Sequence, residues 1–190
     1  MSENADSAAD LPPLPMTVAS PLKVSYQCQT VIGVYPNKKV YYPSNPQPGN
    51  YWFLAINRYT LNADYNVVQS SNDAVPAGIA PYDNTDYMLV AVTYAVSTNR
   101  VPQGPLYNFL IDNGASRQLQ RLEQINGALS CGEISTIAYA LVGVLGPGPS
   151  PVPGIESSTI LQAEAAGTIL TCSLIATKIN NRVIYSPVMQ

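Results

Sequence analysis

The chain has 190 residues, of which 46% are hydrophobic and only 11% are charged, with 9 Lys and Arg against 12 Asp and Glu. This length predicts one main domain with a substantial core, and the net charge of −3 argues against a nucleic-acid-binding surface, which needs clustered basic residues. The chain contains no histidine, which excludes Ser-His-Asp and Cys-His catalysis, histidine acid–base chemistry and zinc sites that need imidazole.

The first segment, residues 1–21, is predicted to be a flexible or polyproline-II-type arm. Its start, MSENADSAADLPPLP, is acidic and poor in large apolar side chains. It lacks the basic start and the apolar core of a signal peptide, and no stretch of 18 or more apolar residues occurs in the chain. We therefore expect synthesis in the cytoplasm without a signal peptide, and no membrane insertion.

Residues 22–43 are predicted to form a β-hairpin. In LKVSYQCQTVIGVY, alternate residues from Val24 through Tyr26 and Cys28 to Thr30 share one face of a strand. Pro36-Asn37 supplies the turn, and a tyrosine-rich strand returns. The proline-containing stretch 44–50 is then a loop.

Two segments have the pattern of central strands, which are buried on both faces. In residues 51–57, YWFLAIN, both alternating sets of side chains are apolar or aromatic, and residues 86–96, DYMLVAVTYAV, behave in the same way. Between them, YNVVQSS is expected to pair with the first as a hairpin. Residues 133–145 are predicted to be a further strand.

One strongly amphipathic helix is predicted, preceded by a shorter helical stretch. Residues 105–112 form the short stretch, which ends at Asn113-Gly114. Ser116 is placed as the N-cap of the second helix. Its apolar stripe consists of Leu119, Leu122, Ile125 and Leu129.

The last part of the chain is divided by the segment GPGPSPVPG. Residues 148–165 are predicted to be a Pro/Gly-rich linker with a short helix-prone segment, although a long surface loop is an equal alternative. Residues 166–190 are predicted to be a C-terminal hairpin with Asn180-Asn181 at its tip, because asparagine tolerates positive φ. The N- and C-terminal hairpins are expected to pair either with each other or with the sheet edge of a neighbouring molecule.

The predicted fold class is therefore mostly β with short helices (α+β). A β-sandwich-like core module over residues 22–147 carries the amphipathic helix and is flanked by the terminal hairpins. Its central part, roughly residues 50–147, resembles the ILEI/PANDER-like domain of secreted cytokine-like proteins and of a glycosyltransferase stem. The matching positions are Ile56-Asn57 and Thr60-Leu61 in the hairpin, Met88 to Tyr94 in the apolar strand, Leu119 to Ile125 in the helix and Tyr139 to Gly143 in the closing strand. The resemblance implies a non-enzymatic β-sandwich-like module with binding roles that include carbohydrate recognition.

The sequence offers little catalytic or metal-binding chemistry, and we predict no enzyme, no cofactor and no metal site. The three cysteines, Cys28, Cys131 and Cys172, have no paired spacing, so buried thiols are expected, with Cys28–Cys172 as the pair to consider for a disulfide. Asp83 and Asp86 offer oxygen ligands but lack the glycine and glutamate of a calcium loop, which favours an Asx turn over a Ca²⁺ site.

Thirteen tyrosines against two phenylalanines favour contact surfaces, because tyrosine combines an apolar ring with a polar tip. The candidates for ligand or subunit contacts are Tyr41, Tyr42, Tyr82 and Tyr107, for which packing within a sheet is the alternative. The leading functional hypothesis is a structural subunit of a large assembly, such as a capsid decoration, tail or fibre-associated protein of a phage or virus particle. It would form homo-oligomers and contact other assembly proteins in the virion. The alternative is a carbohydrate- or protein-binding module of ILEI/PANDER type.

Overall fold

The strands assemble into two antiparallel sheets that pack face to face. Sheet A has the order β11-β10-β1-β2-β3, and sheet B has the order β5-β4-β6-β8, with β7 and β9 also paired to β8. The computed structural model describes residues 11–128, 136–150, 152–160 and 166–189. The prediction of a mostly β, sandwich-like fold is confirmed.

The bounds of the elements follow in chain order. They are β1 (Leu14–Pro21), β2 (Gln29–Ile32), β3 (Lys39–Tyr41), β4 (Asn50–Asn57), β5 (Ala63–Gln69), a 3-10 turn (Ala80–Tyr82), β6 (Tyr87–Tyr94), β7 (Val96–Ser97), a second 3-10 turn (Thr98–Arg100), α1 (Gly104–Asp112), α2 (Arg117–Ala128), β8 (Thr136–Val144), β9 (Ile155–Ile160), β10 (Gly167–Ile179) and β11 (Arg182–Val188).

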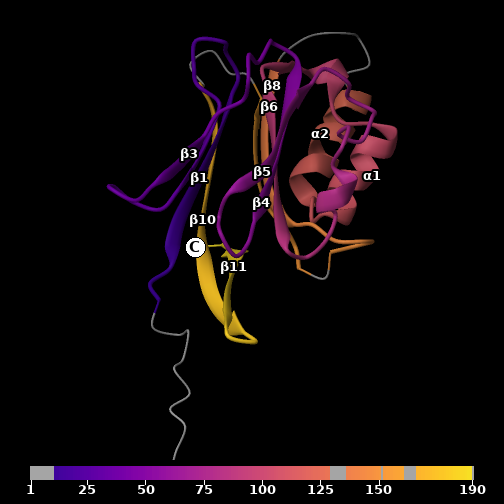
Figure 1. Ribbon diagram of the computed structural model, residues 1–190. Coiled ribbons are helices and arrows are strands. Elements are labelled where there is room, and N and C mark those ends of the chain that lie inside the picture. The colour runs from indigo at the N-terminus through magenta and orange to yellow at the C-terminus, as the bar shows by residue number, and fades with distance from the viewer. Residues whose placement is uncertain (1–10, 129–135, 151, 161–165, 190) are drawn as a thin grey trace, which may run out of the picture.

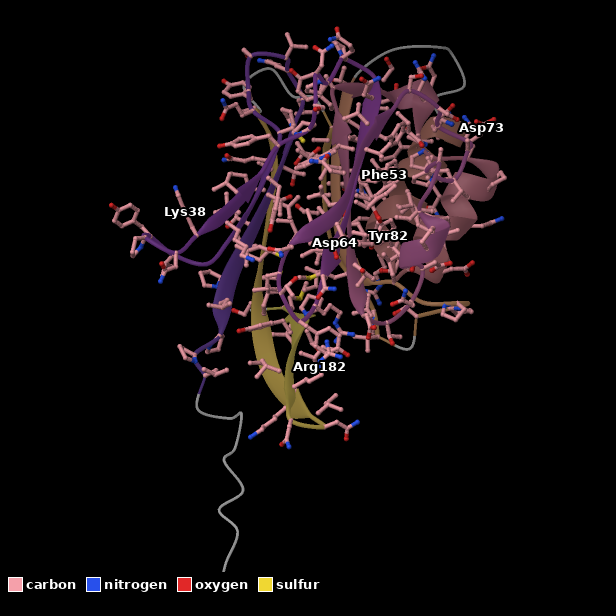
Figure 2. The ribbon with its side chains drawn as sticks, in the orientation of Figure 1. Lys38, Phe53, Asp64, Asp73, Tyr82 and Arg182 are labelled. Carbon is pink, nitrogen blue, oxygen red and sulfur yellow. The ribbon has the colours of Figure 1, made fainter. Side chains whose placement is uncertain are left out.

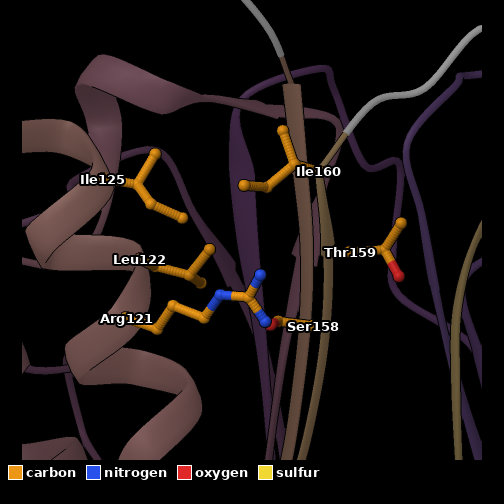
Figure 3. Close-up of a pocket in the computed structure, with 6 residues that line it drawn as sticks. All are labelled: Arg121, Leu122, Ile125, Ser158, Thr159 and Ile160. Atoms are coloured by element: carbon orange, nitrogen blue, oxygen red, sulfur yellow. The ribbon is translucent and has the colours of Figure 1, made fainter. Parts of the chain in front are cut away.

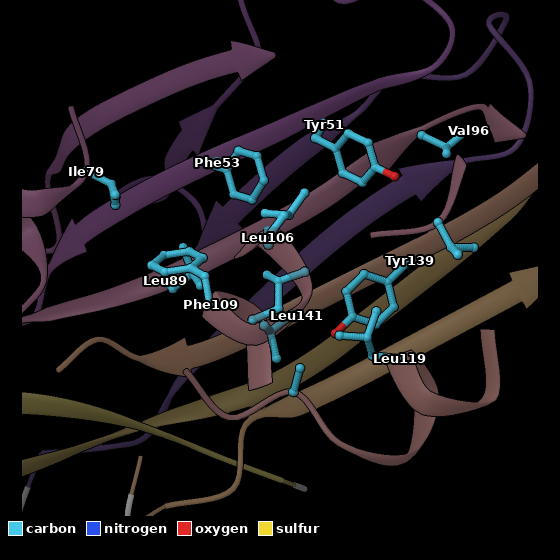
Figure 4. Close-up of a cluster of buried hydrophobic side chains, with 14 of the residues drawn as sticks. Tyr51, Phe53, Ile79, Leu89, Val96, Leu106, Phe109, Leu119, Tyr139 and Leu141 are labelled. Carbon is cyan, nitrogen blue, oxygen red and sulfur yellow. The ribbon is translucent and has the colours of Figure 1, made fainter. Parts of the chain in front are cut away.

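Sheet B is the middle of three layers. Helices α1 and α2 cover its face that points away from sheet A (Figure 1). The two apolar sets of β4 explain this arrangement, because Phe53 packs on the helix side and Leu54 on the sheet A side, both fully buried. Figure 4 shows the helix-side core, where aromatic rings of sheet B meet leucines of the two helices.

A glycine lets the end of α1 approach sheet B closely. A Cβ atom on Gly143 of β8 would lie 2.0 Å from the carbonyl oxygen of Asn113, which is much closer than any real contact. The connection from α1 to α2 therefore crosses β8 where the strand has no side chain.

The prediction of an arm over residues 1–21 is wrong for Leu14–Pro21. These residues form β1, the central strand of sheet A, which pairs with β10 on one side and β2 on the other. Met16 and Val18 are fully buried in the core between the sheets. The sequence pattern did not predict this strand because it contains Pro15 and Pro21, and proline normally argues against a central position in a sheet. Residues 1–10 lie outside the described part of the chain.

The N-terminal hairpin is shorter than predicted. Only Gln29–Ile32 of the predicted first strand belongs to β2, which pairs with β3, while Val24 and Tyr26 are 59% and 48% exposed. Because β1 lies between the two hairpins, β2 and β3 do not pair directly with β10 and β11.

The predicted separation of a core module from a C-terminal hairpin is also wrong. Leu170, Cys172 and Leu174 of β10 fill the same core as Trp52 and Leu54 of β4. The hairpin thus supplies two of the five strands of sheet A, and both tip residues, Asn180 and Asn181, have positive φ.

The helix-prone assignment within residues 148–165 is wrong for Ile155–Ile160, while residues 161–165 lie outside the described part of the chain. Ile155–Ile160 form β9, which adds to the outside of β8 in sheet B. The Pro/Gly-rich stretch is therefore a short connection between two paired strands rather than a linker between modules. Residues 129–135, with Leu129, Cys131 and the start of the predicted strand at 133, lie outside the described residues.

Candidate functional site

The broad surface of sheet A that points away from sheet B is the first candidate. We define the outer face of sheet A by the residues that alternate with its buried ones. They are Pro15, Thr17 and Ala19 of β1, Gln29 and Val31 of β2, Val40 of β3, Ile169, Thr171, Ser173 and Ile175 of β10, and Val188 of β11.

The residues so defined carry no charge. The same row of β10 continues through Thr177 and Ile179 to the hairpin tip, where Ile179 pairs with Arg182, whose guanidinium lies 4.0 Å from the Tyr59 ring. Ile169 is 66% exposed and Ile175 is 42% exposed, at two positions along β10. The outward face of a solvated antiparallel sheet is usually polar. An uncharged face rich in threonine and β-branched apolar residues is instead suited to packing against another surface.

Three of the four predicted contact tyrosines pack against a hydrophobic core. Tyr41 points toward the core between the sheets, and its hydroxyl donates to the carbonyl of Leu61. Tyr82 packs against the helix-side core and makes ring contacts with Tyr65 and Tyr87. It lies on the helix side of sheet B in Figure 2. Tyr107 of α1 also packs there, and burial together with neighbouring Glu123 raises its pKa.

Tyr42 is the predicted tyrosine whose ring lies largely in solvent, at 50% exposure. It lines a shallow cavity of about 220 Å³ with Tyr26, which is 48% exposed. Ser25 and Gln27 add polar groups beside the two rings. Two accessible aromatic rings with nearby hydrogen-bonding groups form a small candidate binding site.

Cys28 and Cys172, the pair considered for a disulfide, are free thiols, which agrees with the expectation of buried thiols for these two residues. Both are buried in the core between the sheets. Burial raises the pKa of Cys28 to about 12 and that of Cys172 to about 11. These thiols are therefore unreactive packing groups at neutral pH.

The second candidate is a cavity of about 420 Å³ where the two sheets meet. Its lining combines Arg58, from the turn between β4 and β5, with the start of the Pro/Gly-rich segment that follows β8 and with Ser186 and Pro187 of β11. Arg58 is only 8% exposed. The Pro/Gly-rich segment thus forms a wall of this cavity, a role that its composition did not predict.

A third hollow lies between α2 and the edge strand β9. It measures about 330 Å³, and the Arg121 side chain extends from α2 toward Ser158 (Figure 3). Leu122 and Ile125 face Ile160 across it. Both α2 and β9 lead into residues outside the described part of the chain.

Glu156 organises the start of α2, which was predicted to be capped by Ser116. One carboxylate oxygen accepts the amide of Gln118 at 3.2 Å and the hydroxyl of Ser116 at 2.9 Å. The other accepts the amide of Leu119 at 3.3 Å and the Tyr139 hydroxyl at 2.7 Å. A carboxylate from β9 thus caps a helix 40 residues earlier, and burial and Glu156 raise the pKa of Tyr139.

These sites offer little catalytic chemistry. Among the described residues, no group of three or more cysteine, aspartate or glutamate side chains is placed to hold a metal ion. Asp83 and Asp86 lie in a turn, where Asn84 Oδ1 accepts the amide of Asp86 at 3.0 Å. No helix in the described ranges is long and apolar enough to cross a membrane.

No known family model matches the sequence, and no curated protein matches it significantly. The resemblance to the ILEI/PANDER-like domain therefore stays a prediction.

Sequence reasoning missed Arg58, Glu156 and the outer face of sheet A. The last had a visible signal, because TILTCSLIAT alternates buried with uncharged residues in a protein with few charges. Arg58 stands as a lone cation directly after the apolar strand β4, which is a weaker indication. Nothing near Glu156 in the sequence indicates that it caps a distant helix.

Proposed function

We propose that the protein is a non-enzymatic structural subunit of a larger protein assembly, of the kind that decorates capsids or builds tails and fibres in phage and virus particles. The uncharged outer face of sheet A is the observation that carries this proposal. The low charged fraction of the whole chain and its many tyrosines agree with extensive subunit contacts.

The occupant of the outer face is a second copy of this chain. A neutral face packs against an identical face without burying charges and without like-charge repulsion. Two sheet faces interdigitate at about 10 Å, and a two-fold axis makes such a contact self-complementary. Ile169 and Ile175 are exposed apolar side chains of this face, on the strand next to the central strand β1.

Light scattering of the full chain, over a range of concentrations, tests this proposal. We expect a dimer or larger oligomer, and we expect Ile169→Lys combined with Ile175→Lys to dissociate it. Losing burial of about 1.5–3 kcal/mol per isoleucine corresponds to a rise of roughly a hundredfold or more in the dissociation constant. Val34→Lys is the matched control, because Val34 is 65% exposed outside the outer face.

Circular dichroism should show that all variants keep the β fold. A wild-type chain that stays monomeric at high micromolar concentration would contradict self-association. So would an oligomer that survives the double lysine variant.

A second candidate function, carbohydrate binding, is favoured by the cavity between Tyr26 and Tyr42. Flat aromatic faces stack on the apolar faces of sugar rings, while Gln27 and Ser25 supply hydrogen-bonding groups. A glycan array probed with the full chain should then give hits that are lost in Tyr26→Ala and Tyr42→Ala but kept in Tyr35→Ala. Tyr35 is 85% exposed and lies outside this cavity. An array without hits, or hits that survive both substitutions, would reject this role.

A further inference from the structure

The cavity beside Arg58 is built from three segments that lie far apart in the sequence. Arg58 follows β4, the apolar wall comes from Val144 and Leu145 at the end of β8, and Ser186 and Pro187 come from β11. Backbone bonds fasten these segments, since Arg58 donates its amide to the Asp86 carbonyl and accepts the Tyr185 amide. The cavity is thus part of the junction between the two sheets.

The guanidinium of Arg58 is held by three hydrogen bonds to uncharged groups. Its Nε donates to the carbonyl of Tyr185 at 2.8 Å, and Nη1 donates to the carbonyl of Thr85 at 2.6 Å. Its Nη2 donates to the hydroxyl of Ser186 at 2.7 Å. Because a guanidinium has five N–H groups, one on each terminal nitrogen has no acceptor among the described residues.

This arrangement leaves a buried positive charge without a bonded carboxylate in the described part of the chain. Burial lowers the pKa of Arg58. The electrostatic effects of nearby Tyr59 and Asp86 raise this pKa, but they are smaller than the effect of burial. The Asp86 carboxylate instead accepts the Tyr59 hydroxyl at 3.0 Å. A buried cation is stabilised when an anion pairs with it, and a guanidinium binds a carboxylate through two parallel bonds.

The rest of the cavity lining is mostly apolar, and hydrogen bonds hold it in place. Val144, Leu145 and Val152 line it together with Pro147, Pro149 and Pro187. The Leu145 amide donates to the Tyr87 carbonyl at 3.0 Å, and the Ser150 amide donates to the Asp112 carbonyl at 2.7 Å. Prolines further restrict this loop, so little ordering would be needed on binding.

We propose that this cavity binds a small ligand with one carboxylate on a flat apolar body, the carboxylate pairing with Arg58 and the body lying against the proline-rich wall. The volume of about 420 Å³ falls in the range of small-molecule sites. This site is separate from the outer face of sheet A, so the ligand adds a function to the proposed structural role.

Isothermal titration of the full chain with 2-naphthoate tests the proposal, with 2-naphthamide as an uncharged control of the same shape. We expect saturable binding of one naphthoate per chain, and binding of the amide weakened at least tenfold. Val152→Trp should fill the cavity and weaken naphthoate binding at least tenfold, because Val152 is 51% exposed and tolerates a larger side chain. Val75→Trp, at an exposed position outside the cavity, should bind as the wild type does.

Arg58→Lys tests the two parallel bonds from the guanidinium to the carboxylate, since it keeps the charge but removes the paired N–H groups. We expect it to weaken naphthoate more than naphthamide. The proposal is overturned if the folded wild type shows no naphthoate binding, if acid and amide bind equally, or if Val152→Trp binds as well as Val75→Trp. None of these outcomes depends on the oligomeric state.

Discussion

The two sheets of this protein differ in what covers them. Sheet B is buried on both faces, by sheet A and by the helices, whereas sheet A is buried only toward sheet B (Figure 1). The burial of the strands shows this difference, because residues 51–56 of β4 are all buried while most neighbouring residues of β10 alternate between buried and more exposed. A face left open but uncharged is therefore a property of sheet A, and it is there that we place contact with other subunits.

The largest expected effect comes from breaking either face of sheet B. We expect both Phe53→Ala and Leu54→Ala to lower the free energy of unfolding, by about 3–5 and 2–5 kcal/mol respectively, because each leaves a cavity in a fully buried core. Urea denaturation at one fixed chain concentration measures both. A loss below 1 kcal/mol at one of these neighbours would mean that sheet B is covered on one side only.

Alanine substitutions at two adjacent residues of sheet A should give unequal losses in the free energy of unfolding. Leu170→Ala removes a side chain that is 2% exposed and should cost about 2–5 kcal/mol. Ile169→Ala, at the adjacent residue, changes a side chain that is 66% exposed and should cost about 0.5 kcal/mol or less. The measurement is made in the background of Ile175→Lys, at a chain concentration at which light scattering shows a monomer. Equal losses at the two positions would contradict a one-sided sheet.

This contrast also explains which parts of the fold the sequence could predict. Strands β4 and β6 have apolar residues in both alternating sets, a pattern that a central strand imposes and few other structures share. Strand β1 is also fully buried on its inner face, at Met16 and Val18, but its two prolines, Pro15 and Pro21, argue against a strand in the sequence. Its pairing with β10 joins residues about 150 positions apart, which no local pattern indicates.

The candidate sites were predictable only where they depend on local chemistry. Tyr42 is exposed, as expected of a contact residue, whereas Tyr41 and Tyr82 pack inward because their strand or turn faces a core. The Arg58 cavity depends on three segments meeting at the sheet junction. Such a site follows from topology, which the sequence pattern did not provide.

The buried thiols of Cys28 and Cys172, in the core between the sheets, should make the protein less stable at alkaline pH. A raised pKa in the folded state means that the protonated thiol is favoured there, so the stabilisation is present below the unfolded pKa near 9.0 and is lost as pH rises. With folded values of about 12 for Cys28 and 11 for Cys172, each thiol should cost about 1 kcal/mol between pH 8 and pH 10.

Unfolding curves at both pH values check this, with Cys28→Ala combined with Cys172→Ala as the comparison. The double variant should lose less stability than the wild type between the two pH values. The tyrosines with raised pKa values also make the free energy of unfolding fall with pH, and they do so equally in both proteins. Identical slopes would show that the inner face of sheet A admits solvent to these sulfurs.

The contact between sheet B and the helices should depend on a single carboxylate. Glu156→Gln keeps the shape of the side chain but removes the charge that faces two amides at the start of α2. We expect a loss of about 1–2 kcal/mol, since a partly buried helix terminus enhances the effect. Ser116→Ala is the control and should cost less, because the carboxylate still accepts the backbone amides. A larger loss in Ser116→Ala would restore serine as the main cap.

The smallest expected effect tests how sheet A is tied to the middle of sheet B. The Ser20 hydroxyl of β1 donates to the Thr93 carbonyl at 2.7 Å, and it lies 3.1 Å from the Tyr139 amide, which donates to it. The Thr93 hydroxyl accepts the same amide at 2.8 Å, so Ser20→Ala alone should cost only about 1 kcal/mol. Adding Thr93→Val leaves the buried amide without an acceptor from either hydroxyl. The double variant should therefore lose more stability than the two single losses combined, and strict additivity would mean that the two hydroxyls do not substitute for one another.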